Sequence, residues 1–126
     1  AWQFGHRVGA QRIVMLNPVV SPGIHLTKHL DGARENPRRK RSYRMTSSAL
    51  RDYLRIDRPP VSHARSLVLL SRDDSVLDYR VAENRFTIEP LSRIVVYDEG
   101  GHTLPLKRHP ALNALVEFVR DARAGD

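Results

Sequence analysis

The sequence contains no cysteine among its 126 residues. This absence excludes disulfide bonds, thiolate nucleophiles and zinc sites with cysteine ligands, so the fold depends on its apolar core. It is compatible with a reducing compartment, and we expect a cytoplasmic protein. No stretch approaches the eighteen or so apolar residues that a membrane span requires, and the first residues lack the charged-then-apolar order of a secretory signal. We therefore expect a soluble chain with no membrane partner.

Residues spaced as metal ligands are also rare in the sequence. His25 and His29 are four residues apart, but no glutamate or third ligand is close to them in the sequence. Their position is more typical of a polar surface than of a metal site. His109 stands beside a proline, and we expect it on the surface as well. The sequence predicts neither a metal nor a cofactor.

The composition permits one modest core. The chain is 40% hydrophobic and 28% charged, which is typical of a globular protein of at most one domain. It begins at Ala1 rather than at a methionine, and its first segment resembles the middle of a domain. We therefore expect further residues upstream of it.

Positive charge is abundant and clustered. The formal net charge is +7, and six basic residues lie within one short segment: Arg34, Arg38, Arg39, Lys40, Arg41 and Arg44. The segment has little apolar surface to fold around, so we predict an exposed loop over residues 34–44. Two interpretations remain open, a solvated surface loop and a patch that binds an anionic partner. Because Tyr43 is the only aromatic residue there, nucleic acid is not the partner that we expect.

Helical and strand patterns alternate along the chain. Continuous apolar runs predict buried parallel strands at residues 13–16, 66–70 and 94–97. Helices are predicted at residues 1–8, ended by Gly9, at 47–56 behind a Thr46 or Ser47 cap, at 78–86, and after Pro110. In the last helix, the apolar face is predicted to consist of Leu112, Leu115, Val116 and Val119.

This alternation predicts the α/β fold class, with a mostly parallel sheet of three strands and helices on both faces. Residues 18–60 are irregular and rich in proline, glycine and arginine, which indicates a lid or cap. Residues 61–126 then form a regular C-terminal part. Three strands make a small sheet with an exposed edge, so we expect more strands from another segment or from a second chain. The same exposed edge could pair with another copy of the chain and form a homo-oligomer.

Two loops follow the second and third strands. Residues 71–78 contain Asp73 and Asp74, and residues 98–104 contain His102 behind two glycines. Because the carboxyl ends of parallel strands meet at one edge of a sheet, both loops open on the same rim. A carboxylate beside an imidazole there is the arrangement in which an acid orients a general base. The glycines would allow the sharp turn that brings the histidine ring over the rim.

Four stretches of the sequence carry a resemblance. They are residues 14–20 with Asn17-Pro18, residues 35–37 (Glu-Asn-Pro), residues 74–80 (Asp-Ser-Val-Leu-Asp-Tyr-Arg) and residues 100–102 (Gly-Gly-His). In this order and at this spacing the chain resembles the small bacterial α/β-hydrolase-fold esterases of the YqiA-like type. The resemblance implies that Asp74 is the acid and His102 the base of a catalytic triad, whereas Asp78 belongs to the following helix.

The sequence departs from that pattern in three places. Asp73 stands where the family has glycine, so either aspartate could face the imidazole, and we prefer Asp74. The family has Gly-Gly-Asn-His where this chain has Glu99-Gly100-Gly101-His102. None of the nine serines lies in a Gly-x-Ser-x-Gly elbow, and Ser21 has only the second glycine. By the resemblance, the nucleophile and the oxyanion-hole donors lie upstream of Ala1.

Two functions follow from these features. The first is the C-terminal half of a serine hydrolase that acts on a small-molecule ester, supplies Asp74 and His102, and is inactive without an upstream or second-chain serine. The second is a non-catalytic α/β module that binds an anionic partner through residues 34–44. The sequence does not identify the ester.

Overall fold

The computed structural model describes residues 5, 8–27, 30, 32–36, 38–56 and 64–121, without the side chains of Ile24, Ile56 and Arg108. The chain divides into two compact units, which are described separately below. One unit consists of residues 1–18 and 60–126, and the other of residues 19–59. The second unit has nearly the extent of the segment that the sequence marks as a lid.

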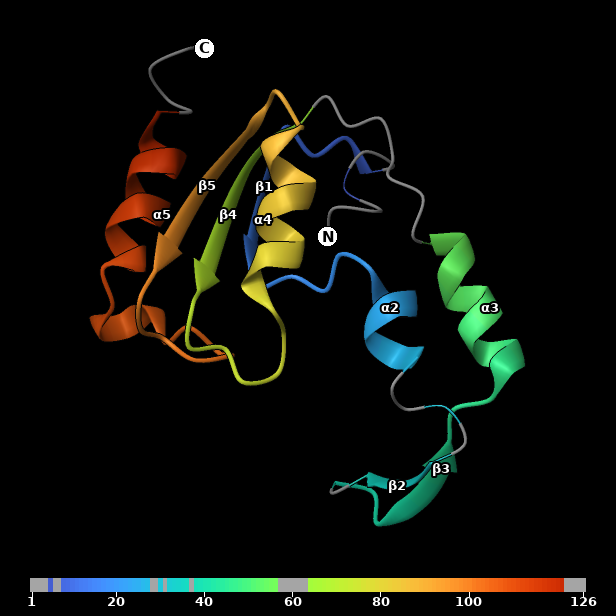
Figure 1. The fold of residues 1–126 in the computed structure, drawn as a ribbon. Helices are drawn as coiled ribbons and strands as arrows, with labels where there is room; N and C mark the ends of the chain where they lie inside the picture. The colour runs from blue at the N-terminus through green and yellow to red at the C-terminus, as the bar shows by residue number, and fades with distance from the viewer. Residues whose placement is uncertain are drawn as a thin grey trace. The chain divides into compact units, whose positions relative to one another are not determined.

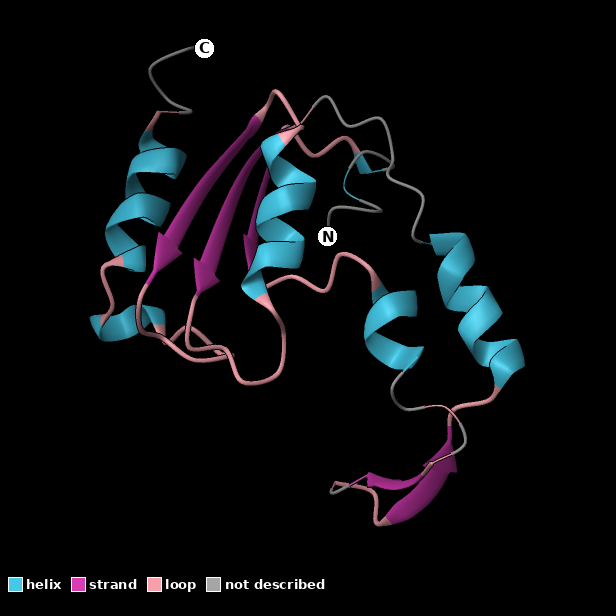
Figure 2. Cartoon of the chain, in the orientation of Figure 1, coloured by secondary structure: helices cyan, strands magenta, loops and turns pink. Residues whose placement is uncertain are grey.

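The first unit contains a parallel sheet of three strands (Figure 1). Strands β1 (Arg12–Leu16), β4 (Arg65–Ser71) and β5 (Ser92–Tyr97) pair in the order β1-β4-β5. Its helical elements are α4 (Tyr79–Thr87), η2 (Leu106–Arg108) and α5 (Ala111–Arg120). The α/β class, the three parallel strands and the flanking helices that the sequence predicts are thus confirmed (Figure 2).

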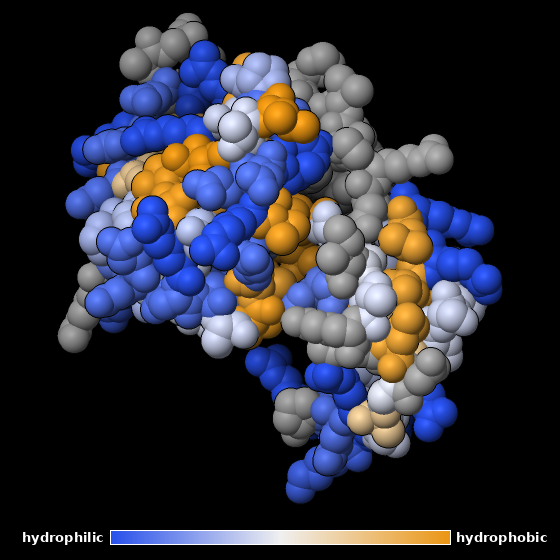
Figure 3. Space-filling model, in the orientation of Figure 1, coloured by the Kyte–Doolittle hydropathy of each residue, from blue (hydrophilic) through white to orange (hydrophobic). Residues whose placement is uncertain are grey.

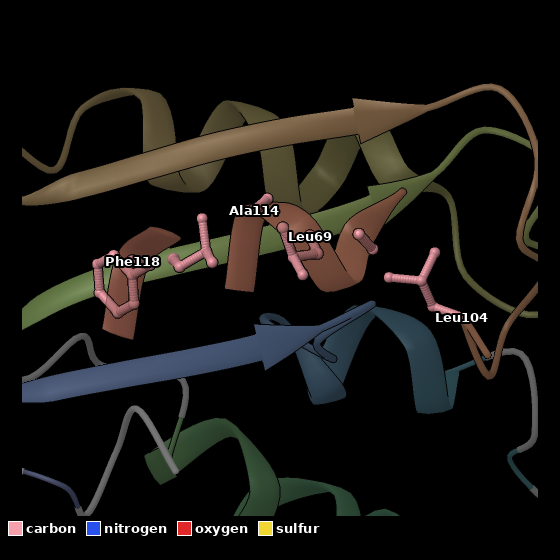
Figure 4. Packing of buried hydrophobic residues seen from close by; sticks show 6 residues of the cluster. Leu69, Leu104, Ala114 and Phe118 are labelled. Carbon is pink, nitrogen blue, oxygen red and sulfur yellow. The ribbon is translucent and has the colours of Figure 1, made fainter. Parts of the chain in front are cut away.

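The core of this unit lies on both faces of β4. Leu67 and Leu69 are fully buried and pack with Leu104 and with Phe118 of α5 (Figure 4). Because successive strand residues point to opposite faces, Val68 and Leu70 face the other layer, where α4 contacts β4 and β5. Burial on both faces explains why the strand reads as an uninterrupted apolar run.

The predicted apolar face of α5 is wrong by about one position. Ala111, Ala114 and Phe118 are the buried residues, whereas Leu112 and Val119 are 38% and 50% exposed. Both sets have helical spacing, so periodicity alone does not choose between them. The two alanines let the helix approach the sheet closely, and the aromatic ring of Phe118 fills the remaining space at its end.

The second unit contains two helices and a hairpin. Helices α2 (Pro22–Thr27) and α3 (Ser47–Ile56) contact each other, and strands β2 (Ala33–Asn36) and β3 (Arg41–Arg44) pair antiparallel. Thr46 caps α3, since its hydroxyl oxygen accepts a hydrogen bond from the N–H of Ala49 at 3.1 Å.

Two elements of this unit were not predicted. Helix α2 is short and begins at Pro22, the position where proline is favoured in a first turn. The basic segment was predicted to be a loop, but the structure shows the hairpin of β2 and β3. The sequence gives no strand signal here, because all of the cationic side chains are exposed and none alternates with a buried residue.

The predicted N-terminal helix lies mostly outside the described residues. Gly9, which was expected to end that helix in a left-handed conformation, has a φ of 69°. None of the helices in the described ranges combines the length and the apolar character that crossing a bilayer requires.

Candidate active site

The two strand-end loops bring Asp74 and His102 together. Nδ1 of His102 lies 3.0 Å from Oδ2 of Asp74, although the residues are 28 positions apart in the sequence. Asp74 follows β4 and His102 follows β5, and these strands are neighbours in the parallel sheet. The juxtaposition therefore follows from the sheet topology.

The carboxylate of Asp74 is covered and held from one side. Its side chain is 1% exposed, and its Oδ1 accepts hydrogen bonds from the N–H groups of Val76 at 2.8 Å and Leu77 at 3.0 Å. Burial alone raises the pKa of Asp74, but the hydrogen bond from His102, those two N–H groups and the electrostatic attraction to the His102 side chain together lower it below its ordinary value of 3.8. The acid is therefore ionised at neutral pH.

An ionised acid fixes the tautomer of His102. A carboxylate accepts hydrogen bonds but donates none, so Nδ1 of the ring carries the proton that points to Asp74. In the neutral ring Nε2 is then left with a lone pair, and within the described residues it has no recorded hydrogen-bond partner. The side chain of His102 is 44% exposed. Its Nε2 can thus accept a proton from an incoming hydroxyl group.

The neighbouring Asp73 has a different position. Its Oδ1 accepts a hydrogen bond from the N–H of Gly101 at 2.8 Å, and its Oδ2 accepts one from the N–H of Gly100 at 3.3 Å. Asp73 therefore binds the backbone of the histidine loop, while Asp74 binds the histidine ring. Of the two aspartates, the structure brings only Asp74 to the imidazole.

Asn17 was quoted in the sequence only for the resemblance, yet it lies at the centre of this rim. It is 6% exposed, and its Nδ2 donates to the backbone oxygens of Gly101 at 2.8 Å and His102 at 3.0 Å. Its Oδ1 accepts a hydrogen bond from the N–H of Ser71 at 2.9 Å. One amide thus joins the ends of β1 and β4 to the histidine loop.

His109 was predicted to be a surface residue, but both of its ring nitrogens have partners. Its Nδ1 accepts from the N–H of Ala111 at 3.1 Å, so Nε2 carries the proton and donates to the backbone oxygen of Glu99 at 2.8 Å. Its ring also meets Tyr97 edge-on at 4.8 Å between centroids. His109 therefore ties the start of α5 to the histidine loop.

The two glycines before His102 are required by the turn, as the sequence predicts. Gly100 has a φ of 143° and Gly101 a φ of 58°. A Cβ atom at Gly100 would lie 2.5 Å from Cδ1 of Leu104 and 2.7 Å from Oγ of Ser71. Any other residue at position 100 would therefore displace the buried Leu104 or the end of β4.

The remaining predicted residues lie elsewhere. Asp78 is the N-cap of α4, where its Oδ1 accepts from the N–H of Arg80 at 3.0 Å. His25 is in α2, and His29 lies outside the described residues. In the segments that the structure describes, no group of three or more histidine, aspartate or glutamate side chains could hold a metal ion.

Comparison with known proteins gives one assignment. No curated protein matches the chain. A family model described as "Uncharacterised protein family (UPF0227)" matches residues 1–120, which is nearly the whole sequence. The chain therefore belongs to the uncharacterised protein family UPF0227.

Proposed function

We propose that this chain supplies the acid and the base of a serine hydrolase that transfers acyl groups from small-molecule esters. The observation that carries the proposal is the 3.0 Å hydrogen bond between the covered carboxylate of Asp74 and the exposed ring of His102. Membership in UPF0227 and the resemblance to the YqiA-like esterases support it. The α/β sheet, with both loops at the carboxyl ends of its strands, supports it as well.

In this mechanism His102 moves the proton and Asp74 holds His102. Nε2 takes the proton of a serine hydroxyl while the serine oxygen attacks the ester carbonyl carbon. The imidazolium then gives that proton to the leaving alcohol as the carbon–oxygen bond breaks. A water molecule repeats the two transfers on the acyl-enzyme and releases the acid. Asp74 stabilises the imidazolium electrostatically and stays ionised throughout.

The nucleophile is proposed to come from outside the 126 residues, because none of the serines in the sequence has the glycines of an elbow. Strand β1 is an edge of the sheet among the described residues. A further parallel strand added beside β1 would end on the same rim as the loops of Asp74 and His102. An elbow after that strand would aim its hydroxyl toward Nε2.

The hydrogen bonds around the histidine loop support a catalytic use of the ring. Asp73, Asn17 and His109 bind the backbone at residues 99–102 from three different elements. A base that is fixed before the substrate arrives has less reorganisation to undergo during the reaction.

The decisive experiment uses the chain extended upstream through the first Gly-x-Ser-x-Gly elbow, with a p-nitrophenyl acyl ester as substrate. We expect ester hydrolysis that falls by about 10³-fold or more in His102→Ala and in Asp74→Asn. Lys107→Ala, an exposed substitution near the same rim, should leave the rate unchanged. Undiminished hydrolysis in His102→Ala would refute the proposal.

A second measurement needs no nucleophile. In the 126-residue chain, the Nδ1 proton of His102 should give a downfield proton resonance, because it is held between a ring nitrogen and a carboxylate. Asp74→Ala should abolish this resonance, and Asp73→Ala should retain it. A resonance that survives in Asp74→Ala and disappears in Asp73→Ala would exchange the roles that we give to the two aspartates.

A further inference from the structure

The basic hairpin has no part in the proposed hydrolysis. Residues 33–44 carry six basic side chains and one acidic side chain, Glu35. All six basic side chains are exposed, and the surface over β2 and β3 is hydrophilic (Figure 3). None of the ion pairs found among the described residues involves the hairpin. Its positive charge is therefore available to a partner.

The strand register places an aromatic ring between two arginines. Arg34 pairs with Tyr43, and Asn36 pairs with Arg41. Because paired residues share a face and the faces alternate along each strand, Arg34, Tyr43 and Arg41 lie on one face. Glu35 lies on the opposite face, where it pairs with Ser42. The face that carries Tyr43, which is 50% exposed, is thus free of acidic side chains.

The turn of the hairpin is held by its own backbone. Oδ1 of Asn36 accepts from the N–H groups of Arg38 at 3.0 Å and Arg39 at 3.1 Å, and its backbone oxygen accepts from the N–H of Lys40 at 2.8 Å. Lys40 has a φ of 47°, a left-handed conformation that glycine adopts at lower cost.

We propose that this hairpin binds single-stranded nucleic acid. The guanidinium groups of Arg34 and Arg41 and the three cations of the turn would bind backbone phosphates, and a base would stack on the exposed ring of Tyr43. The sequence alone weighed against this partner because it holds a single aromatic residue. The hairpin register changes that interpretation, because it places the ring and the flanking cations on one face.

An anionic membrane is the less suitable partner. Peripheral membrane segments combine basic side chains with apolar ones that enter the bilayer. Within β2 and β3 the side chains other than Tyr43 are charged, polar or as small as Ala33, so the hairpin offers almost nothing to insert. A single strand of nucleic acid, by contrast, is recognised by phosphate contacts and by base stacking, and the hairpin offers cations for the first and Tyr43 for the second.

The test measures binding of the 126-residue chain to a labelled oligothymidylate and to vesicles of phosphatidylcholine and phosphatidylserine. If Arg34, Arg41 and the three cations of the turn bind phosphate, the slope of log affinity against log salt is about −3.5, which corresponds to a loss of about 130-fold from about 50 to about 200 mM salt. The variant Arg38→Gln/Arg39→Gln/Lys40→Gly should reduce the slope to about −1.4 and the loss to about 7-fold. The hydrogen bonds of the turn use backbone groups and Asn36, so this variant keeps them.

The matched control removes three exposed cations elsewhere. Arg65→Gln/Lys107→Gln/Arg120→Gln changes the net charge equally and should leave the slope near that of the unchanged chain. Equal losses in the two triple variants would refute a site at the hairpin, because net charge alone would then explain the binding. Binding to the vesicles without binding to the oligonucleotide would refute the partner.

Substitutions of Tyr43 separate the contribution of base stacking to the affinity from the contribution of charge. Tyr43→Leu should weaken oligonucleotide binding by about 5-fold to 150-fold with an unchanged salt slope, and Tyr43→Phe should bind as the unchanged chain does. Circular dichroism on both variants verifies that the fold is kept. Equal affinity of the leucine and phenylalanine variants would show that no base stacks on the ring at position 43, and it would refute the proposal.

Discussion

Asn17 offers the sharpest test of how the histidine loop is held. Asn17→Ala removes one amide that accepts from Ser71 and donates to two backbone oxygens of the loop. Ser71 is 0% exposed, so its N–H loses its partner with no water to replace it, which costs about 1–3 kcal/mol. The backbone oxygens of Gly101 and His102 lie nearer to solvent, where water can replace the lost donor. Losing their two hydrogen bonds to Asn17 should therefore cost about 1 kcal/mol or less in total.

The backbone of Asn17 adds to this loss. Its φ is 39°, and a left-handed conformation costs alanine about 1 kcal/mol more than it costs asparagine, whose side chain can bond locally. We therefore expect Asn17→Ala to lower the free energy of unfolding by about 2–5 kcal/mol in urea titrations. Asn17→Gly loses the same hydrogen bonds, but glycine adopts the left-handed conformation without strain. Its free energy of unfolding should therefore fall by less than that of the alanine variant.

Asn17→Asp tests the donor alone. Its carboxylate can still accept from Ser71, but its second oxygen would face the backbone oxygens of Gly101 and His102. We expect this variant to be as unstable as Asn17→Ala at neutral pH and to recover stability as the pH falls, because a protonated carboxyl group can donate a hydrogen bond.

Amide hydrogen exchange locates the effect. The amides of Gly101 and Leu104, which donate to Asp73 and to the backbone oxygen of Gly100, should lose protection in Asn17→Ala by more than the amides in the middle of β4 do. Two results would refute the reasoning: a loss below about 1 kcal/mol in both the alanine and the aspartate variants, or a uniform loss of protection with no excess in the histidine loop.

Four further predictions concern stability in urea titrations. Asp74→Ala, which loses the acceptor of two backbone N–H groups, should be about 1–2 kcal/mol less stable than Asp74→Asn. Because folding lowers the pKa of Asp74 from 3.8, its ionisation stabilises the fold above that pH, and the advantage over Asp74→Asn should vanish as the pH falls through the folded-state value. His109→Phe keeps a ring against Tyr97 but leaves the N–H of Ala111 without its acceptor, and should cost about 1–2 kcal/mol. Phe86→Ala, at 0% exposure, should cost about 3–5 kcal/mol, against less than about 0.5 kcal/mol for Ile88→Ala at 74% exposure; similar losses would contradict the described core.

The sheet and the meeting of the two loops could be predicted because both depend on local signals. The run from Leu67 to Leu70 is apolar throughout, and a strand buried on both faces needs such a run. Parallel strands end on one rim, so a side chain in the loop after each of two neighbouring strands lies near the other. The rule places the loop of residues 71–78 beside the loop of residues 98–104, while the choice of Asp74 over Asp73 came from the resemblance.

The supporting contacts could not be predicted, because they depend on distant parts of the chain. The partners of Asn17 are 54 and 84 residues away in the sequence, and nothing near Asn17 indicates them. The face of α5 presents a similar problem, since two apolar stripes have the same spacing and only close packing against β4 chooses between them. The hairpin was missed because its strands have no buried side that would give a period of two.

The two departures from the YqiA-like pattern around the site become one feature in the structure. Asp73 replaces a glycine of that pattern, and Gly100-Gly101 stand directly before His102, where the pattern has an asparagine in between. The carboxylate of Asp73 binds the N–H groups of these same two glycines. The new carboxylate and the altered turn therefore depend on each other, and their substitutions should not be additive. Asp73→Gly alone should release the turn, whereas in a chain whose turn is also changed to Gly-Gly-Asn-His it should cost less, since a differently shaped turn would keep the N–H groups of positions 100 and 101 but would no longer direct both of them at the carboxylate.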